Sequence, residues 1–268
     1  MEWLSLLAGT VTLRPYVFAF LACFLVLATW HLGLRRALVF LVTAYTIAFL
    51  SEYSSTRNGF PYGFYTYIET TRGRELWVAN VPFMDSLSYA FLSYFSYTMS
   101  LFFLSPLEGR GWDRRWGDNA TVRHAGKTVL LGAVLFMLLD VVIDPVAFRG
   151  DRWFLGKIYT YEDPGDYFNI PLSNFGGWLL VGTAILFVFT RIDRALGPQP
   201  GPGDIGRRTV PGQALLGPGV YFGVLAFNLS VTFYIGEWLL GLCGLALTGA
   251  IAGAVCYKLR HPAAFTAT

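Results

Sequence analysis

Charge is scarce in this sequence. Only 14% of its 268 residues are Asp, Glu, Lys or Arg, whereas 54% are hydrophobic, and the mean hydropathy is +0.49. Soluble domains carry about 25% charged residues, so this composition predicts an integral membrane protein. No stretch resembles a separate soluble domain, a nucleotide-binding loop or a nucleic-acid surface, and we expect no nucleic-acid partner.

Histidine and cysteine are scarce as well, with three of each. Two histidines, His124 and His261, fall in a basic loop and in the tail, and none has a second histidine at ligand spacing. Zinc, haem and di-iron sites need denser clusters, so the sequence predicts neither a metal site nor a redox cofactor. The cysteines lie in or beside apolar segments without redox spacing and are expected to be apolar filler.

Long apolar runs are what the sequence has instead. Crossing the bilayer core takes about 20 apolar residues. Four windows with at most one charged residue reach that length: 15–34, 86–107, 167–190 and 209–257. The last window is 49 residues long and contains only Glu237, so it has room for two spans joined by a turn near 234–238.

Two further predicted spans are either short or contain charged residues. The first, 37–51, is short, and the second, 128–148, contains Asp140 and Asp144. We therefore predict an all-α fold, a polytopic membrane helix bundle with about seven transmembrane helices (six to eight). Residues 1–268 are expected to form a single integral membrane domain.

The distribution of Lys and Arg predicts the orientation, because cytoplasmic loops are enriched in them. With seven spans, the side that carries the N-terminus holds seven of these residues and the other side thirteen. We expect a multi-pass protein of the cell (inner) membrane with its N-terminus outside and its C-terminus cytoplasmic. The Pro/Gly-rich stretch 197–212 is predicted to be a flexible cytoplasmic linker between the fifth and sixth spans.

Two loops on the predicted outer side repeat a pattern. Each runs from a carboxylate through Tyr-Thr-Tyr, at 65–67 and at 159–161, to an acidic residue. An apolar-Pro-apolar step, at 81–83 and at 170–172, then opens the next span. Two matched loops predict one site built between them.

Carboxylates are the groups available for acid–base chemistry at this depth. Asp140 and Asp144 are four residues apart, which places both on one helix face, and their repulsion in a low dielectric favours a shared proton. The functional interpretation is a proton donor with a polarising neighbour. The structural alternative is that both pair with Arg149, Arg152 or Arg57 and tie helix ends together.

Three further acidic side chains are expected at the same depth, towards the outer ends of the predicted spans. Glu52 ends the second predicted span and is either a second member of an acid/base set or a helix end that is solvated or paired with Arg57. Asp85 opens the third span, where a carboxylate also suits the free N–H groups of a helix N-terminus. Glu237 lies in the turn between the last two spans and is expected to be solvated.

Aromatic residues are dense in the first loop, with five between positions 60 and 67. They form either an interfacial aromatic belt or a pocket for a flat polyene whose carbocation they stabilise. Asn174 opens the fifth span, where it either holds a water or caps the helix. The candidate substrate-binding residues are Phe60, Tyr62, Phe64, Tyr65, Tyr67, Asp85, Tyr161, Asn174 and Trp178.

At these residues the chain resembles the integral-membrane carotenoid hydratase family, which includes the bisanhydrobacterioruberin hydratases. The resemblance extends over about residues 40–190. The motifs that carry it are Glu52, then GFPYGFYTY at 59–67, Val81-Pro82, Asp140-x3-Asp144-Pro145 and Asn174-Phe175-x-Gly177-Trp178. The chain departs from the expected pattern at Asn80, where a Gly is expected, and at Tyr89, where a Trp is expected.

The resemblance implies a hydro-lyase of the carotenoid 1,2-hydratase type that needs no cofactor. Such enzymes add water across the terminal C1–C2 double bond of an acyclic (ψ) carotenoid end, giving a 1-hydroxy carotenoid. Asp140 or Asp144 would protonate C2, and Glu52 would act as the base on the water side. The aromatic residues would stabilise the cation, with Asn174 and Asp85 in support. The implied partners are the bilayer, a carotenoid (lycopene, γ-carotene or a C50 precursor) and other carotenoid enzymes.

Two other functions compete with this one. In a magnesium-dependent membrane prenyltransferase, Asp140 and Asp144 would chelate the metal together with Asp163 and Asp166. In a proton-coupled transporter, the two echoing halves would surround the membrane carboxylates.

Overall fold

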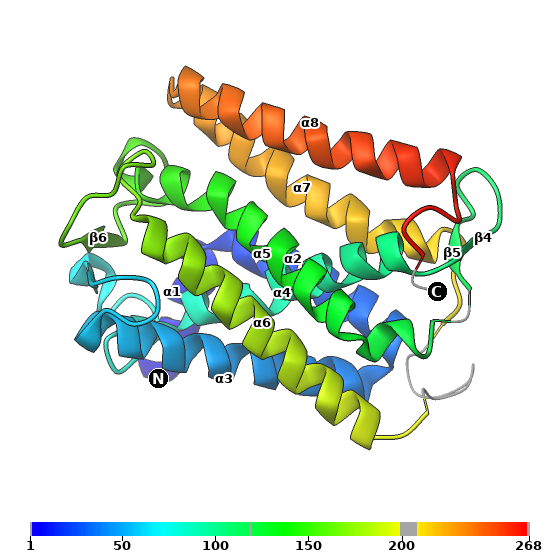
Figure 1. The fold of residues 1–268 in the computed structure, drawn as a ribbon. Coiled ribbons are helices and arrows are strands. Elements are labelled where there is room, and N and C mark those ends of the chain that lie inside the picture. Colours follow the sequence, from blue (N-terminus) through cyan, green and yellow to red (C-terminus); the bar gives the residue numbers. More distant parts are fainter. Residues whose placement is uncertain (1, 118, 199–207, 267–268) are drawn as a thin grey trace.

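The structure is a computed structural model that describes residues 2–117, 119–198 and 208–266. Within these residues the chain forms eight α-helices, and seven of them are long and apolar enough to cross a membrane (Figure 1). The seven are α2 (Pro15–Leu32), α3 (Leu34–Asn58), α4 (Phe83–Leu104), α5 (Gly126–Ala147), α6 (Leu172–Ala195), α7 (Gln213–Tyr234) and α8 (Trp238–Arg260). The eighth, α1 (Glu2–Leu13), is shorter. The predicted all-α bundle with seven spans is confirmed.

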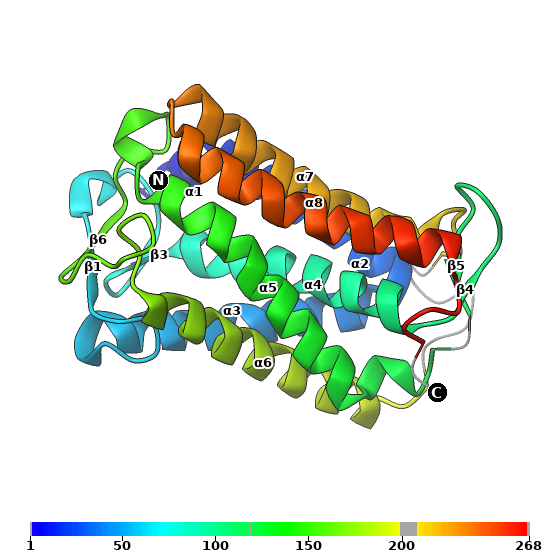
Figure 2. The ribbon, with the colours of Figure 1, turned by 45° about the horizontal axis from the view of Figure 1, so that its top comes forward.

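Helix α4 forms the centre of the bundle. It is buried around nearly its whole circumference and packs against α2, α3, α5, α6 and α7. A helix that is covered on all sides must satisfy its own polar groups, and the hydroxyls of Ser93 and Ser96 donate to the carbonyls of Tyr89 and Leu92 one turn earlier. Helix α8 packs on the outside of α7 (Figure 2).

One predicted span boundary is wrong in a way that matters for the site. Helix α3 continues to Asn58, beyond the predicted end at residue 51. Glu52 therefore lies inside the helix and is buried, instead of standing at a solvated helix end. The predicted turn between the last two spans is confirmed, since α7 ends at Tyr234 and α8 begins at Trp238.

The two matched loops meet at the end of the bundle that also holds the N-terminus (Figure 1). Strand β1 (Tyr65–Tyr67) pairs antiparallel with β6 (Tyr159–Tyr161), so that Tyr65 faces Tyr161 and Tyr67 faces Tyr159. Strands β2 (Trp77–Val78) and β3 (Val81–Pro82) form a second pair within the first loop. The 3-10 helices η1 (Glu69–Thr71) and η3 (Gly150–Arg152) complete the two loops.

The opposite end holds the C-terminus and a third strand pair, β4 (Leu107–Glu108) with β5 (Arg115–Trp116). Near the 3-10 helix η2 (Val122–His124), the fully buried Asp193 accepts hydrogen bonds from Arg36 and Arg123, each at 2.7 Å. This cluster joins α3, α6 and η2. Residues 199–207 of the predicted linker 197–212 lie outside the described residues.

Candidate active site

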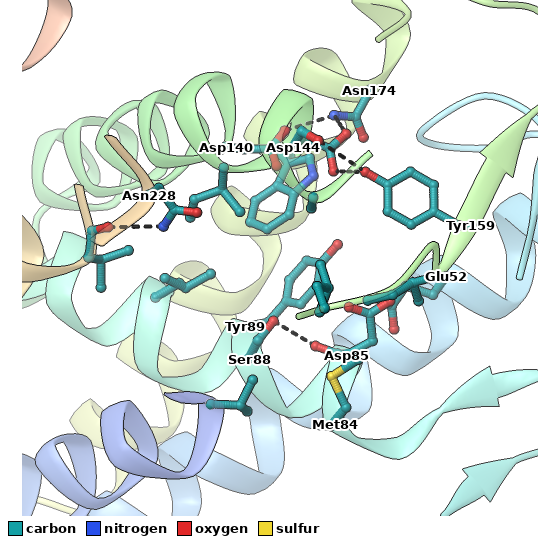
Figure 3. Close-up of a pocket in the computed structure, with 18 of the residues that line it drawn as sticks. Glu52, Met84, Asp85, Ser88, Tyr89, Asp140, Asp144, Tyr159, Asn174 and Asn228 are labelled. Carbon is teal, nitrogen blue, oxygen red and sulfur yellow. Dashed lines mark hydrogen bonds between the residues drawn. The ribbon is translucent and has the colours of Figure 1, made fainter. Parts of the chain in front are cut away.

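A cavity of about 130 Å³ lies beneath the paired strands β1 and β6. One water needs roughly 10–15 Å³ of such space, so the cavity has room for an organic group and a water together. Its walls come from α2 to α7 and from the two matched loops. Four carboxyl side chains line it: Glu52, Asp85, Asp140 and Asp144 (Figure 3).

Asp140 and Asp144 lie on one wall, held together by Asn174 of α6. The Asn174 amide donates to Asp140 Oδ2 at 2.7 Å and to Asp144 Oδ2 at 3.0 Å. Asp144 also accepts hydrogen bonds from the hydroxyls of Tyr159, at 2.5 Å, and Tyr161, at 3.2 Å, on strand β6. Asp140 is completely buried, and its Oδ1 atom has no hydrogen-bond partner among the described residues.

The arginines do not neutralise this pair. Within the described residues, Arg149 and Arg152 both form ion pairs with Glu237, and neither aspartate belongs to an ion pair. The idea that the two aspartates merely tie helix ends to arginines is therefore wrong. The expectation that Glu237 is simply solvated is wrong as well.

Glu52 and Asp85 lie on the facing wall (Figure 3). Glu52 accepts a hydrogen bond from the Ser86 hydroxyl and a second from the Tyr67 hydroxyl at 3.2 Å. Arg57, its expected partner, instead donates to Asn80 at 2.8 Å.

Asp85 has a cation in its neighbourhood. Arg14 is close enough to act on the Asp85 charge, and it forms a buried ion pair with Glu75 at 3.4 Å. A buried Arg14–Glu75 ion pair therefore lies beside this wall, whereas among the described residues Asp140 and Asp144 accept hydrogen bonds only from neutral donors.

The strand tyrosines remain protonated in this setting. Burial raises the pKa of Tyr159 and Tyr161 well above its usual value, and the nearby charge of Asp144 raises it further. Burial raises the pKa of Tyr65 and Tyr67 in the same way, with the carboxyl groups of Glu52 and Asp85 adding to the effect. These hydroxyls are therefore hydrogen-bond donors across the physiological pH range.

Aromatic rings form the remaining inner wall. Tyr89 stacks on Trp178 with ring centroids 4.6 Å apart, and Phe136 lies 4.6 Å from the same indole. Tyr62 packs beside them, and its hydroxyl lies 2.9 Å from the hydroxyl of Ser51. Stacked rings of this kind offer their negative faces to a developing positive charge.

Most of the predicted site residues come together in this cavity. Phe60 and Phe64 do not line it, and these residues are 63% and 46% exposed. The ten that line it are Glu52, Tyr62, Tyr65, Tyr67, Asp85, Asp140, Asp144, Tyr161, Asn174 and Trp178.

Sequence reasoning missed three residues that complete the site. Tyr159 has a signal, since it opens the second Tyr-Thr-Tyr copy. Tyr89 is the position where the chain departs from the resembled family, and it now stands in the cavity wall. Ser86, the donor to Glu52, carries no signal beyond standing next to Asp85.

Comparison with known proteins identifies the family of this chain. The profile of the family described as "Carotenoid biosynthesis protein" matches residues 3–251, nearly the whole chain. The chain belongs to this family. Over 198 residues it is 29% identical to the bisanhydrobacterioruberin hydratase of Haloarcula japonica.

That alignment covers 69% of this chain and 59% of the relative, so the chain spans less than two thirds of the relative's length. No solved structure matches the chain. Family membership and the seven apolar helices make this a multi-pass membrane protein of carotenoid biosynthesis.

The acidic residues required by the prenyltransferase hypothesis do not converge. Asp163 and Asp166 are exposed in the second loop and do not line the cavity. Both Asp144 oxygens are already engaged by tyrosine and asparagine donors.

Proposed function

We propose that this protein is a carotenoid hydratase that adds water across the terminal C1–C2 double bond of an acyclic carotenoid end. The product is a 1-hydroxy carotenoid, and no redox cofactor takes part. The observation that carries the proposal is the cavity in which Asp140, buried and without a cation, faces Glu52 across a space walled by aromatic rings. Family membership and the hydratase relative support the same reaction class.

Hydrogen bonding distinguishes the roles of the two aspartates. Asp144 accepts hydrogen bonds from three donors, a pattern that stabilises a carboxylate. Asp140 accepts only one, and its Oδ1 atom has no hydrogen-bond partner among the described residues. Two negative charges one helical turn apart repel strongly in a low dielectric, so one proton stays with the pair. Asp140 is therefore the acid that delivers its proton to C2, and Asp144 is the fixed negative charge that stabilises the cation at C1.

Glu52 acts as the base. It accepts hydrogen bonds from Ser86 and Tyr67, which suits an ionised carboxylate. As the C1–C2 π electrons take the Asp140 proton, a water attacks C1 and gives a proton to Glu52. The C2–H and C1–O bonds form, the π bond breaks, and Glu52 returns its proton to Asp140 through solvent before the next turnover.

Expression in a lycopene-producing bacterium, followed by chromatography and mass spectrometry of the pigments, tests the proposal. We expect a pigment heavier by one water, which disappears with Asp140→Asn protein that accumulates normally. Lycopene, γ-carotene and an elongated C50 precursor should each be supplied. If the protein is well expressed and all three carotenoids remain unchanged, the hydratase function is refuted.

A further inference from the structure

The cavity does not end at the carboxylates. It continues between α2 and α7 to four aromatic side chains that we term the aromatic mouth: Tyr16 and Phe20 of α2, Trp153 of the second loop and Phe227 of α7. Asn228, beside Phe227, marks this side of the cavity, opposite Asp144 and Tyr159 (Figure 3).

The rings of the aromatic mouth contact one another across the seam between the two helices. Tyr16 stacks on Phe227 with centroids 5.2 Å apart, and Trp153 lies 6.2 Å from Tyr16 and 6.3 Å from Phe227. Phe20 stacks on Phe91 of α4 at 5.8 Å, which continues the aromatic lining inward. All four rings of the mouth line the cavity and are half-buried.

The size of the cavity requires an outlet. A space of about 130 Å³ encloses the end group of an isoprenoid but not a conjugated chain of tens of carbons. Helix α7 leaves room next to the mouth, since Gly223 stands one turn before Phe227 on the same face and has no atom within 4 Å of where a Cβ would be. The seam is thus apolar and aromatic, with open space at Gly223 one turn from Phe227.

We propose that the acyclic chain of the substrate passes between α2 and α7 through the aromatic mouth into the lipid, while its end group occupies the cavity. This inference rests on the proposed function. Phe227 and Tyr16 then determine which chains are accepted, because a flat polyene packs favourably on their ring faces and a wider one collides with them.

A reversible block of the mouth tests the inference without altering folding. Phe227→Cys is made in a background in which Cys23, Cys243 and Cys256 are replaced by alanine, and the folded protein reacts with benzyl methanethiosulfonate. We expect the modified protein to hydrate a full-length acyclic carotenoid about tenfold more slowly or worse, the scale on which a pocket rejects a group that does not fit. Dithiothreitol should restore the rate in the same sample.

A matched control is Phe187→Cys on α6, whose phenylalanine is exposed and does not line the cavity. Its modification should change nothing. Undiminished hydration by fully modified Phe227→Cys protein would overturn the inference. The amount of carotenoid that copurifies with each sample gives a second readout that does not depend on chemistry. If no sample hydrates any carotenoid, the proposed function fails. Even then, a loss of bound carotenoid that is confined to modified Phe227→Cys protein supports the passage of the chain through the aromatic mouth. Equal carotenoid retention in all samples refutes that passage.

Discussion

Asp140 and Asp144 share one amide donor, but only Asp144 receives the two tyrosine hydroxyls. This asymmetry is a property of single residues and predicts unequal roles. Asp140→Asn keeps the shape of the side chain and its contact with Asn174 but removes the transferable proton. We expect its hydration rate to fall by about 10²–10⁴-fold, the usual contribution of a general acid, measured as initial rates with purified protein. If the Asp140→Asn variant hydrates the substrate at a rate within a few-fold of wild type, another group supplies the proton.

The strand tyrosines lead to a prediction about pH. Tyr159→Phe removes the donor at 2.5 Å from Asp144, and a hydrogen bond to a charged group is worth about 1.5–3 kcal/mol. We therefore expect its rate to drop by about ten- to hundredfold.

Because burial raises the pKa of Tyr159 and Tyr161, their protons stay in place above the pH at which an exposed tyrosine ionises. The ratio of wild-type to Tyr159→Phe rates should therefore remain constant from neutral pH up to about 10, the usual tyrosine pKa. A ratio that collapses towards one as the pH rises through this range would mean that Tyr159 ionises there and that its donor role is misassigned.

At the scale of elements, close packing of α6 against the first loop holds the aromatic wall in position. A Cβ added at Gly177 would lie 2.4 Å from the Tyr62 ring and 2.9 Å from the Pro61 carbonyl oxygen, whereas a Cβ at Gly176 would meet nothing within 4 Å. Gly177→Ala should therefore displace Tyr62, destabilise the protein by about 1–3 kcal/mol and lower the hydration rate. Gly176→Ala is the matched control, which should leave the hydration rate unchanged and not destabilise the protein. Thermal unfolding in detergent and rate measurements on the two variants check this, and equal behaviour would contradict the packing argument.

The same scale shows how far the sequence could predict this structure. Apolar length and charge spacing are local properties, and they located the seven spans and the turn before Trp238. The repeated Tyr-Thr-Tyr motif predicted one site between the two loops, and in the structure the two copies meet, since β1 and β6 pair residue by residue.

The sequence could not predict which side of a loop an individual side chain occupies, nor which residues far apart in the chain interact. Phe60 and Tyr62 stand in the same aromatic run, yet Phe60 is exposed and Tyr62 is buried, a difference that no periodicity in an irregular loop predicts. The pairing of Glu237 with arginines of another loop was equally invisible, because no local pattern connects positions so far apart.

At the scale of the whole molecule, Glu237 forms ion pairs with Arg149 and Arg152, which join the turn between α7 and α8 to the loop after α5. Burial alone would raise the pKa of Glu237, but the hydrogen bonds and charges of Arg152 and Arg149 outweigh it and hold the pKa below its usual 4.5. A lowered carboxyl pKa stabilises the fold at pH above the unfolded-state value, and the stabilisation is lost as the pH falls through the folded-state value.

We expect Glu237→Gln to lower the free energy of unfolding by about 1 kcal/mol at neutral pH. The difference from wild type should be smaller at an acidic pH than at neutral pH, because the stabilisation is lost as the carboxyl becomes protonated in the folded state. Thermal unfolding in detergent at the two pH values measures this, with the exposed Glu162→Gln as the control that should match wild type throughout. An equal deficit at both pH values would assign the effect to packing instead of charge.

Orientation concerns the molecule as a whole and decides on which side of the membrane the proposed hydration would take place. Strands β1 and β6, whose tyrosines line the cavity, stand at the end that carries fewer Lys and Arg, and β4 and β5 stand at the basic end. The positive-inside tendency therefore predicts that the cavity opens in the outer half of the membrane. In a background without the native cysteines, Asp163→Cys in the exposed second loop should react with a membrane-impermeant maleimide in intact cells. Trp112→Cys, at a position that is 90% exposed at the other end, should react only after the cells are permeabilised. The reverse labelling pattern would place the carboxylates in the cytoplasmic half and would mean that the protonation and water capture proposed for Asp140 and Glu52 draw on cytoplasmic water.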